Sequence, residues 1–162
     1  MNRAPRVALD TNVLVYAQGV LSAPADQPKI DTARALIRGL LRGGARPVAP
    51  AQALAELHRV LTRKGGLDRA DAETRVRRVG AASEIAGTTS SAWDAALALA
   101  TDHRLQIFDA VTLAVAVEAG ADLLLSEDLR DGFSWRGLVV RNPFAAAPAP
   151  DVGRLITMGA MP

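Results

Sequence analysis

The feature that most constrains this chain is the alternation of short apolar runs with longer segments of helical spacing. Residues 6–9, 122–125 and 138–140 are runs typical of buried strands, and Pro47-Val48 is a weaker candidate. Segments with a helical apolar period separate them, and the pairs Gly43-Gly44 and Gly65-Gly66 end two of these segments. Strands that alternate with helices predict an α/β domain with a central, mainly parallel β-sheet flanked by α-helices.

Spacing and capping residues also indicate where the helices lie. We expect helices over residues 11–19, 30–41, 54–61, 69–78, 92–103 and 108–119. Asp68 is expected to cap the fourth of these, and Ser91 the fifth, in a capping box with Asp94. Residues 1–144 are predicted to form one domain, and the Ala/Pro-rich residues 145–162 a C-terminal tail that is loose or packed only locally.

Composition excludes several kinds of site. The chain has 162 residues, 49% of them hydrophobic, which is too apolar for a disordered protein. It has no cysteine, and this excludes disulfides, a thiolate zinc site and a cysteine nucleophile. It shows neither a signal-peptide core nor a run of 18 apolar residues, so we expect a cytoplasmic protein with no membrane partner.

The net charge of +2 carries little weight. Only Lys29 and Lys64 of the 19 basic residues are lysine, and arginine suits phosphate recognition. An Arg- and Ala-rich composition also arises from coding bias, however. Basicity alone therefore does not indicate a nucleic-acid partner.

Four acidic residues occupy unusual positions. Asp10 ends the first predicted strand, and Asp128 lies three residues beyond the apolar run that ends at Leu125. Ligands of open parallel sheets bind at the carboxyl ends of the strands, which is where these two acids are expected. Glu56 has apolar neighbours in sequence, and Asp109 begins a strongly apolar helix.

Each acid also has a plainer interpretation. Asp10 and Asp109 are suitable helix caps, and Glu56 is suitable as a partly solvated helix residue. Asp128 has two acidic neighbours, Glu127 and Asp131, so it is equally suitable as surface charge. If the four carboxylates converged, however, they would repel one another unless a cation lay between them. An all-carboxylate site favours Mg²⁺ or Mn²⁺ over zinc.

The segments that carry these acids resemble four motifs of the PIN-domain nucleases, in the same order along the chain. They are Val7-Ala8-Leu9-Asp10-Thr11-Asn12-Val13-Leu14-Val15-Tyr16-Ala17, then Leu54-Ala55-Glu56 with Val60-Leu61-Thr62-Arg63-Lys64, then Phe108-Asp109-Ala110-Val111-Thr112-Leu113-Ala114, and Leu124-Leu125-Ser126-Glu127-Asp128-Leu129. Asn142-Pro143-Phe144 matches a common ending of bacterial members. The resemblance covers residues 6–144 and is strongest to the toxin ribonucleases of VapBC-type toxin–antitoxin pairs.

The resemblance implies a role for each motif. Asp10, Glu56, Asp109 and Asp128 would be the catalytic metal ligands, for Mg²⁺ or Mn²⁺. Asn12 and Ser126 would orient the carboxylates through hydrogen bonds. Thr11 would support the strand-to-helix turn. Such toxins form homodimers and are held inactive by a cognate antitoxin. Two positions depart from the usual family pattern: Ala49-Pro50-Ala51 replaces a small polar residue before Glu56, and Phe108 replaces tryptophan.

The chemistry that this implies is hydrolysis of an RNA phosphodiester bond, with tRNA among the candidate substrates. One or two metal ions would activate water, and no side-chain nucleophile is needed. We expect RNA contacts from basic side chains near the acids, namely Arg59, Arg63, Lys64 and Arg130. His58 and His103 are given no catalytic role, and Tyr16, Trp93 and Trp135 are more typical of packing than of base stacking.

Three alternatives remain open at this point. A phosphoaspartyl receiver domain would also place an aspartate at a strand end. It would require a second acid beside Asp10 and a lysine near the site, whereas Thr11 and Asn12 follow Asp10 here. A non-catalytic RNA- or protein-binding module would have no need of all four acids. A PIN-fold nuclease outside a toxin pair, acting in RNA processing or on DNA flaps, would have the same motifs.

Overall fold

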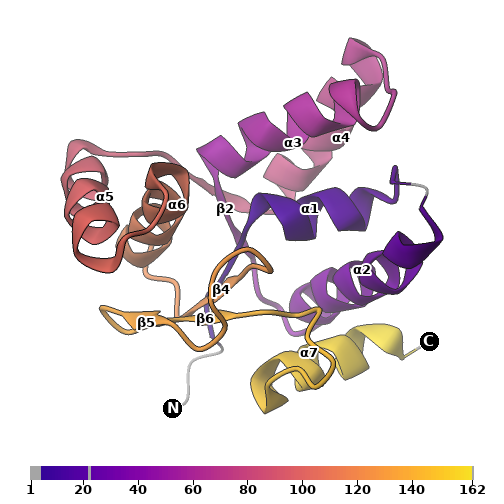
Figure 1. Cartoon of the computed structure of the whole chain (residues 1–162). Helices are drawn as coiled ribbons and strands as arrows, with labels where there is room; N and C mark the ends of the chain where they lie inside the picture. Colours follow the sequence, from indigo (N-terminus) through magenta and orange to yellow (C-terminus); the bar gives the residue numbers. More distant parts are fainter. Residues whose placement is uncertain (1–4, 22, 162) are drawn as a thin grey trace.

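Residues 5–21 and 23–161 are described in the computed structural model, where a single sheet separates two layers of helices (Figure 1). The strands are β1 (Val7–Leu9), β2 (Val48–Pro50), β3 (Glu84–Ala86), β4 (Leu123–Leu125), β5 (Ser134–Trp135) and β6 (Leu138–Arg141). Their order across the sheet is β3-β2-β1-β4-β6-β5. Every neighbouring pair is parallel except β5 and β6, which are antiparallel. The predicted α/β class with a mainly parallel sheet is confirmed.

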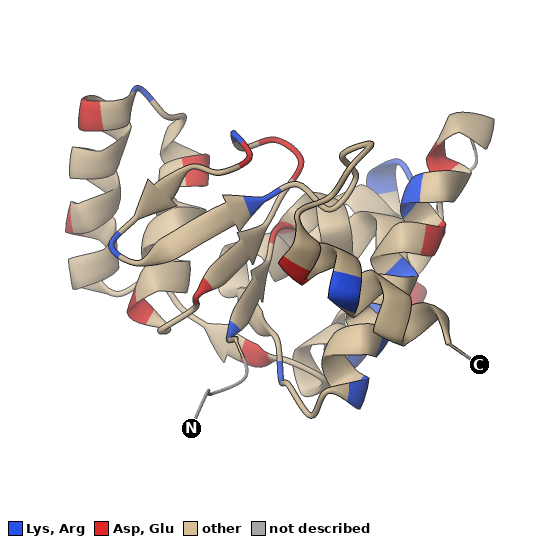
Figure 2. Ribbon diagram, turned by 90° about the horizontal axis from the view of Figure 1, so that it is seen from below, with Lys and Arg blue, Asp and Glu red and all other residues tan. Residues whose placement is uncertain are grey.

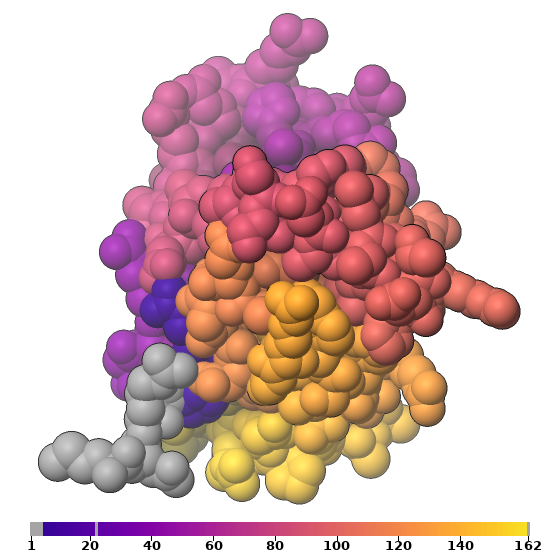
Figure 3. Space-filling model, turned by 90° about the vertical axis from the view of Figure 1, so that its left-hand side faces the viewer, coloured from indigo at the N-terminus to yellow at the C-terminus, as the bar shows by residue number. Residues whose placement is uncertain are grey.

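The helices cover both faces of this sheet. They are α1 (Thr11–Gln18), the short 3₁₀ helix η1 (Pro24–Asp26), α2 (Gln27–Arg42), α3 (Ala51–Arg63), α4 (Arg69–Ala81), α5 (Ser90–His103), α6 (Ile107–Glu118) and α7 (Pro150–Ala160). Helices α5 and α6 pack on one face, and α1 to α4 with α7 pack on the other (Figure 1). On the side of the molecule that carries α5 and α6, the surfaces of α5 and of the β5–β6 hairpin are continuous (Figure 3).

Successive side chains of β1 point to opposite faces of the sheet, so this short strand packs against both helical layers. Val7 and Leu9 point into the core beneath α1 to α4, whereas Ala8 points into the core beneath α5 and α6. All three are buried, so the strand has no polar face. An apolar run of this kind is typical of a parallel strand covered on both sides.

The pairing of β1 with β4 determines where polar groups gather. Leu9 lies opposite Leu125, so the two strands end at the same level. Asp10 and Ser126 follow them directly, at the carboxyl edge of the sheet. The strand order reverses between β1 and β4, which makes this edge the topological switch point where ligands of such sheets bind.

The structure corrects three local predictions. Thr89, and not Ser91, caps α5: its hydroxyl accepts a hydrogen bond from the Ala92 N–H at 3.0 Å. The short strands β3 and β5 were not predicted. The expectation of a loose tail is wrong, because Pro150–Ala160 form α7, which packs along α2 with Val152 buried.

The contact between α2 and α7 depends on glycine. A Cβ atom on Gly159 would lie 1.6 Å from the Ala35 carbonyl oxygen, and one on Gly39 would lie 2.0 Å from the Leu155 carbonyl oxygen. The two helix backbones therefore touch at this crossing. Figure 1 shows α7 lying beside α2, on the side away from α3.

The two helical layers also differ in charge (Figure 2). Within their described bounds, α5 and α6 contain acidic residues but no Lys or Arg, whereas α2, α3 and α4 each contain at least two Arg, and α2 also contains Lys29. None of the helices in the described part of the chain combines the length and the apolar character needed to cross a membrane.

Candidate active site

Asp10 belongs both to the sheet edge and to the start of α1. Its backbone N–H donates to the Leu125 carbonyl at 3.0 Å and extends the β1–β4 pairing by one residue. Its Oδ1 accepts from the Thr11 N–H at 2.7 Å, and its Oδ2 accepts from the Ser126 hydroxyl at 2.6 Å. Only 8% of the residue is exposed. Asp10 therefore caps α1, as the plainer interpretation expected, and at the same time presents its second oxygen to the site.

The other three acids lie on three further segments of the chain. Glu56, half-buried on α3, accepts a hydrogen bond from the Thr11 hydroxyl at 2.7 Å. Asp109 lies in the first turn of α6, whose cap is Gln106, so Asp109 is not the cap of its helix. Asp128 lies exposed on the loop after β4, where its Oδ2 accepts from the Asn12 amide at 3.1 Å.

Electrostatics shows that these four carboxylates share one region. Burial raises the pKa of Asp10, hydrogen bonds from Ser126 and Thr11 oppose this, and the charges of Asp109 and Asp128 raise the pKa further. Burial also raises the pKa of Asp109, as do the charges of Asp128 and Glu56. Each of the two perturbed groups therefore responds to the negative charge of other members of the set.

No basic side chain in the described part of the chain, residues 5–21 and 23–161, is ion-paired with these acids. In that same part of the chain, no three Asp, Glu, His or Cys side chains are spaced closely enough to hold a metal ion as they stand. The acids face one another without a counter-charge.

Asn12 and Ser126 connect the first and the last acid. The Asn12 amide lies 3.4 Å from Asp10 Oδ2 and 3.1 Å from Asp128 Oδ2, so it donates toward both. The Ser126 hydroxyl, besides donating to Asp10, accepts from the Asp128 N–H at 3.2 Å. Both side chains bridge β1–α1 and the loop after β4. The orienting role that the resemblance implies for them stays a prediction.

A cleft of about 270 Å³ opens beside two of these acids, Glu56 and Asp128. Its lining residues are Thr11, Asn12, Val15, Tyr16, Leu21, Glu56, Arg59, Val60, Lys64, Glu127 and Asp128. Of the basic residues expected to contact RNA, Arg59 and Lys64 therefore lie at this cleft. Arg63 and Arg130 are exposed but do not line it.

Sequence reasoning missed a cluster at the rim of this cleft, formed by Tyr16, Lys29, Glu127 and Phe144 and called the rim cluster below. Lys29 Nζ lies 2.7 Å from Glu127 Oε2 and 5.2 Å and 5.8 Å from the ring centres of Tyr16 and Phe144. The two rings meet edge to face at 5.1 Å. The only available signal was that Lys29 is one of two lysines in a chain rich in arginine.

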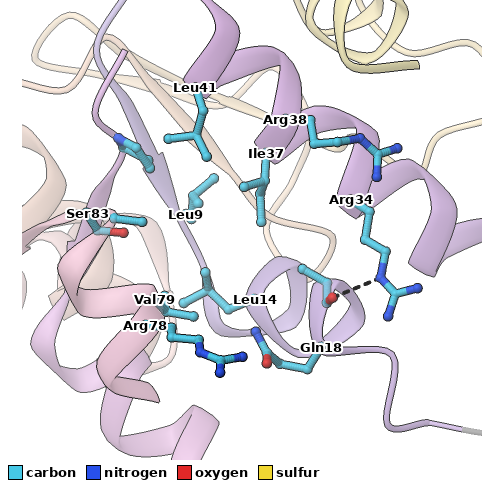
Figure 4. A pocket seen from close by; sticks show the side chains of 13 residues that line it. Leu9, Leu14, Gln18, Arg34, Ile37, Arg38, Leu41, Arg78, Val79 and Ser83 are labelled. Carbon is cyan, nitrogen blue, oxygen red and sulfur yellow. Dashed lines mark hydrogen bonds between the residues drawn. The ribbon is translucent and has the colours of Figure 1, made fainter. Parts of the chain in front are cut away.

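A second hollow, of about 280 Å³, lies on the other side of α1 (Figure 4). Its floor is apolar and includes Leu9, Leu14, Ile37, Leu41 and Val79. Three arginines from α2 and α4 stand around it: Arg34, Arg38 and Arg78. Within the described residues none of the three is ion-paired; Arg34 donates to the Ala17 carbonyl at 3.1 Å, and Arg38 to the Gly159 carbonyl at 3.0 Å. We call this hollow the arginine groove.

Comparison with known structures supports the fold described here. A toxin–antitoxin complex from Klebsiella pneumoniae is similar with a TM-score of 0.59 and 17% identity, over 85% of this chain and 98% of that chain. VapC20 from Mycobacterium tuberculosis, described as a toxin that cleaves the sarcin–ricin loop, is similar with a TM-score of 0.56 and 18% identity, over 73% and 86%. VapBC2 from Rickettsia felis, bound to promoter DNA, is similar with a TM-score of 0.57 and 15% identity, over 83% and 96%.

At these identities the likeness is one of fold. No curated protein matches the chain by sequence. The PIN-domain family model, however, matches residues 7–134, which include all four acids and the whole edge formed by β1 and β4. The chain belongs to the PIN-domain family.

Proposed function

We propose that this protein is a divalent-metal-dependent endoribonuclease, the toxin of a VapBC-like toxin–antitoxin pair. The observation that carries the proposal is the set of four carboxylates, Asp10, Glu56, Asp109 and Asp128, which come from four segments to one sheet edge and have no basic partner among the described residues. Burying and crowding unpaired carboxylates costs free energy, which a bound cation would offset.

The donor set fits Mg²⁺ or Mn²⁺, because every side chain offered is a carboxylate oxygen. Asp10, Glu56, Asp109 and Asp128 would hold the ion after moving closer together than they lie in the metal-free protein, where no three acids of the described residues are spaced for a metal. Both Asp10 oxygens already accept hydrogen bonds, but each carboxylate oxygen has a second lone pair that would be free to bind the ion. When bound, a divalent cation supplies activation of water and neutralisation of charge at the phosphate.

The chain's own residues supply positioning. Ser126 and Thr11 fix the Asp10 carboxylate on both of its oxygens, and the Thr11 hydroxyl holds Glu56 against the start of α1. Arg59 and Lys64, which line the cleft beside Glu56, would bind the phosphates of the RNA on either side of the cut. Arg63 and Arg130 would add weaker contacts from the exposed surface.

The first test is cleavage of total cellular RNA by purified protein with Mg²⁺, with Mn²⁺ and with EDTA. We expect cleavage only with metal, and loss of cleavage in Asp10→Asn and Asp109→Asn, because each variant removes a charged ligand while keeping the size of the side chain. Circular dichroism checks that both variants remain folded. Cleavage at the wild-type rate by both would show that the carboxylates are not catalytic.

We further propose that the partner is an antitoxin protein. Two of the similar structures are toxin–antitoxin assemblies, and the arginine groove offers this chain a suitable surface. Its apolar floor, with Arg34, Arg38 and Arg78, which form no ion pair with any described residue, would complement an apolar segment flanked by acidic residues. We also propose that the protein forms a homodimer, is located in the cytoplasm and has tRNA among its candidate substrates.

The second test is copurification of the chain with the product of the adjacent gene. We expect a stable complex, and we expect Arg38→Glu together with Arg78→Glu to weaken it at least tenfold, since each reverses a charge at the groove. Arg69→Glu, on the exposed start of α4 and outside the groove, is the matched control. A complex unaffected by the double variant would place the partner elsewhere.

Two other functions remain as alternatives. A PIN nuclease of RNA processing would cut RNA in the first test but form no complex in the second. A non-catalytic binding module would bind RNA without cutting it, and metal titration by calorimetry would then detect no ion at the four acids.

A further inference from the structure

Glu127 is a fifth carboxylate at the proposed active site. It lies between Ser126 and Asp128 on the loop after β4 and lines the same cleft as Glu56. The Glu127 N–H donates to the Asn12 side-chain oxygen at 3.4 Å, and the amide nitrogen of the same Asn12 donates to Asp128. A further negative charge here would oppose the entry of an RNA phosphate into the cleft.

Lys29 is the cation that meets this charge. It projects from the first turn of α2 and reaches Glu127 Oε2 at 2.7 Å, across 98 residues of sequence. Side-chain exposure is 38% for Lys29 and 21% for Glu127, so the pair is screened by water only in part. Nothing else among the described basic residues pairs with Glu127.

Aromatic contacts hold the ammonium group in that place. The Tyr16 hydroxyl accepts from Lys29 Nζ at 3.4 Å, and the rings of Tyr16 and Phe144 lie within reach for cation–π attraction. The cluster thereby joins α1, α2, the loop after β4 and the segment after β6. An isolated surface ion pair would have no such support and would contribute little.

We propose that Lys29 is a positioning residue that neutralises Glu127 and holds this carboxylate at the rim, so that RNA entering the cleft meets the uncompensated charges of Glu56 and Asp128 but not that of Glu127. The inference rests on the proposed ribonuclease function. Lys29 is therefore assigned no contact with the reacting atoms or with RNA: it acts through Glu127.

The test is a double-mutant cycle on RNA binding. Lys29→Met, Glu127→Gln and the double variant are prepared in an Asp10→Asn background, and the Kd for a labelled single-stranded RNA is measured by fluorescence anisotropy with Mg²⁺ present. We expect Lys29→Met to weaken binding about fivefold or more, because it leaves Glu127 uncompensated. The double variant should bind like the Asp10→Asn parent, and Glu127→Gln alone at least as tightly as that parent.

Lys64 provides the matched control, since it is the other lysine and lines the same cleft. Lys64→Met should also weaken binding, but Glu127→Gln should not restore it, because Lys64 would meet RNA directly. A loss that persists in Lys29→Met with Glu127→Gln would show that Lys29 acts on RNA by its own charge and would overturn the proposal. Unchanged binding by Lys29→Met would overturn it as well.

Thermal unfolding separates positioning from a purely structural role. A structural role would lower the Tm of Lys29→Met while leaving the Kd of the folded protein unchanged, and this result too would overturn the proposal. If the wild type neither cut nor bound RNA, the proposed function and this inference would fail together. If the wild type cut RNA but the cycle showed no coupling, only the inference would fail.

Discussion

At the scale of single residues, the Ser126 hydroxyl serves two parts of the site at once. It donates to Asp10 Oδ2 at 2.6 Å and accepts from the N–H groups of Asp128 and Leu129 at 3.2 Å and 3.4 Å. It is fully buried, so water cannot replace it. One side chain thus fixes both the first acid and the turn that presents the last.

Ser126→Ala should therefore lower activity without unfolding the protein. We expect kcat/KM for RNA cleavage to fall about 10- to 100-fold, the usual effect of removing a residue that orients a metal ligand. Mn²⁺ affinity, measured by calorimetry, should fall in parallel. Ser134→Ala, an exposed serine on β5, is the control and should change neither quantity. Equal activity in the two variants would contradict the orienting role.

The sequence predicts the residues of the site better than the contacts among them. Asp10 and Asp128 could be expected at one edge because each lies at or just beyond the end of a short apolar run. The Lys29–Glu127 pair could not, because it depends on how the start of α2 meets a loop 98 residues further on. Roles for Arg59, Arg63, Lys64 and Arg130 stay predictions, although two of them line the cleft.

At the scale of elements, the crossing of α2 and α7 is the tightest helix contact described here. Gly39 and Gly159 allow the two backbones to touch, and the Arg38 and Arg42 side chains donate to carbonyls at the end of α7. These bonds satisfy orphan groups at a helix C-terminus. Helix α7 thus belongs to the core beneath α1 to α4, in which Val152 is buried.

Two glycines of α7 should respond in opposite ways to alanine. Gly159→Ala would place a methyl group 1.6 Å from the Ala35 carbonyl oxygen, so we expect a loss of about 1–3 kcal/mol in the free energy of unfolding. Gly153 has nothing within 4 Å of its Cβ position, so Gly153→Ala should stabilise the helix by up to about 1 kcal/mol. Urea denaturation measures both. Equal effects would show that α7 does not dock as described.

The elements missed by sequence were missed for physical reasons. Val152, Leu155 and Ile156 have helical spacing, but they follow an Ala/Pro-rich stretch that reads as loop. Strand β3 has a single large apolar side chain, Ile85, and 55% of it is exposed, so no apolar run marks the strand. The prediction that residues 1–144 form one domain stays a prediction.

At the scale of the whole molecule, the four acids become neighbours only when β1, α3, α6 and the loop after β4 have assembled. In the folded, metal-free protein the pKa of Asp109 is raised by burial and by the charges of Asp128 and Glu56. The folded state then binds more protons than the unfolded state, starting at the ordinary aspartate pKa of 3.8. Stability contributed by this group therefore falls as pH rises through the window from 3.8 to the raised value.

Asp109→Asn should remove this cost. With EDTA present, we expect the variant to be more stable than the wild type at neutral pH and equally stable below pH 3.8, where the aspartate is protonated in both states. Urea denaturation across that range measures the difference. Asp94→Asn, an exposed acid on α5, is the control and should follow the wild type. If the variant's free energy of unfolding exceeded that of the wild type by the same amount at every pH, the effect would be one of packing and not of charge.

The placement of β4 between β1 and β6 has a consequence during synthesis. Asp10 leaves the ribosome 116 residues before its partner Ser126, and β1 cannot pair with β4 until then. A growing chain therefore contains Asp10 and Glu56 long before it contains the edge that would bring them to Asp128. The protein is translated from the same kind of molecule that we propose it cuts, and its strand order delays assembly of the proposed active site until the template has been read past β4.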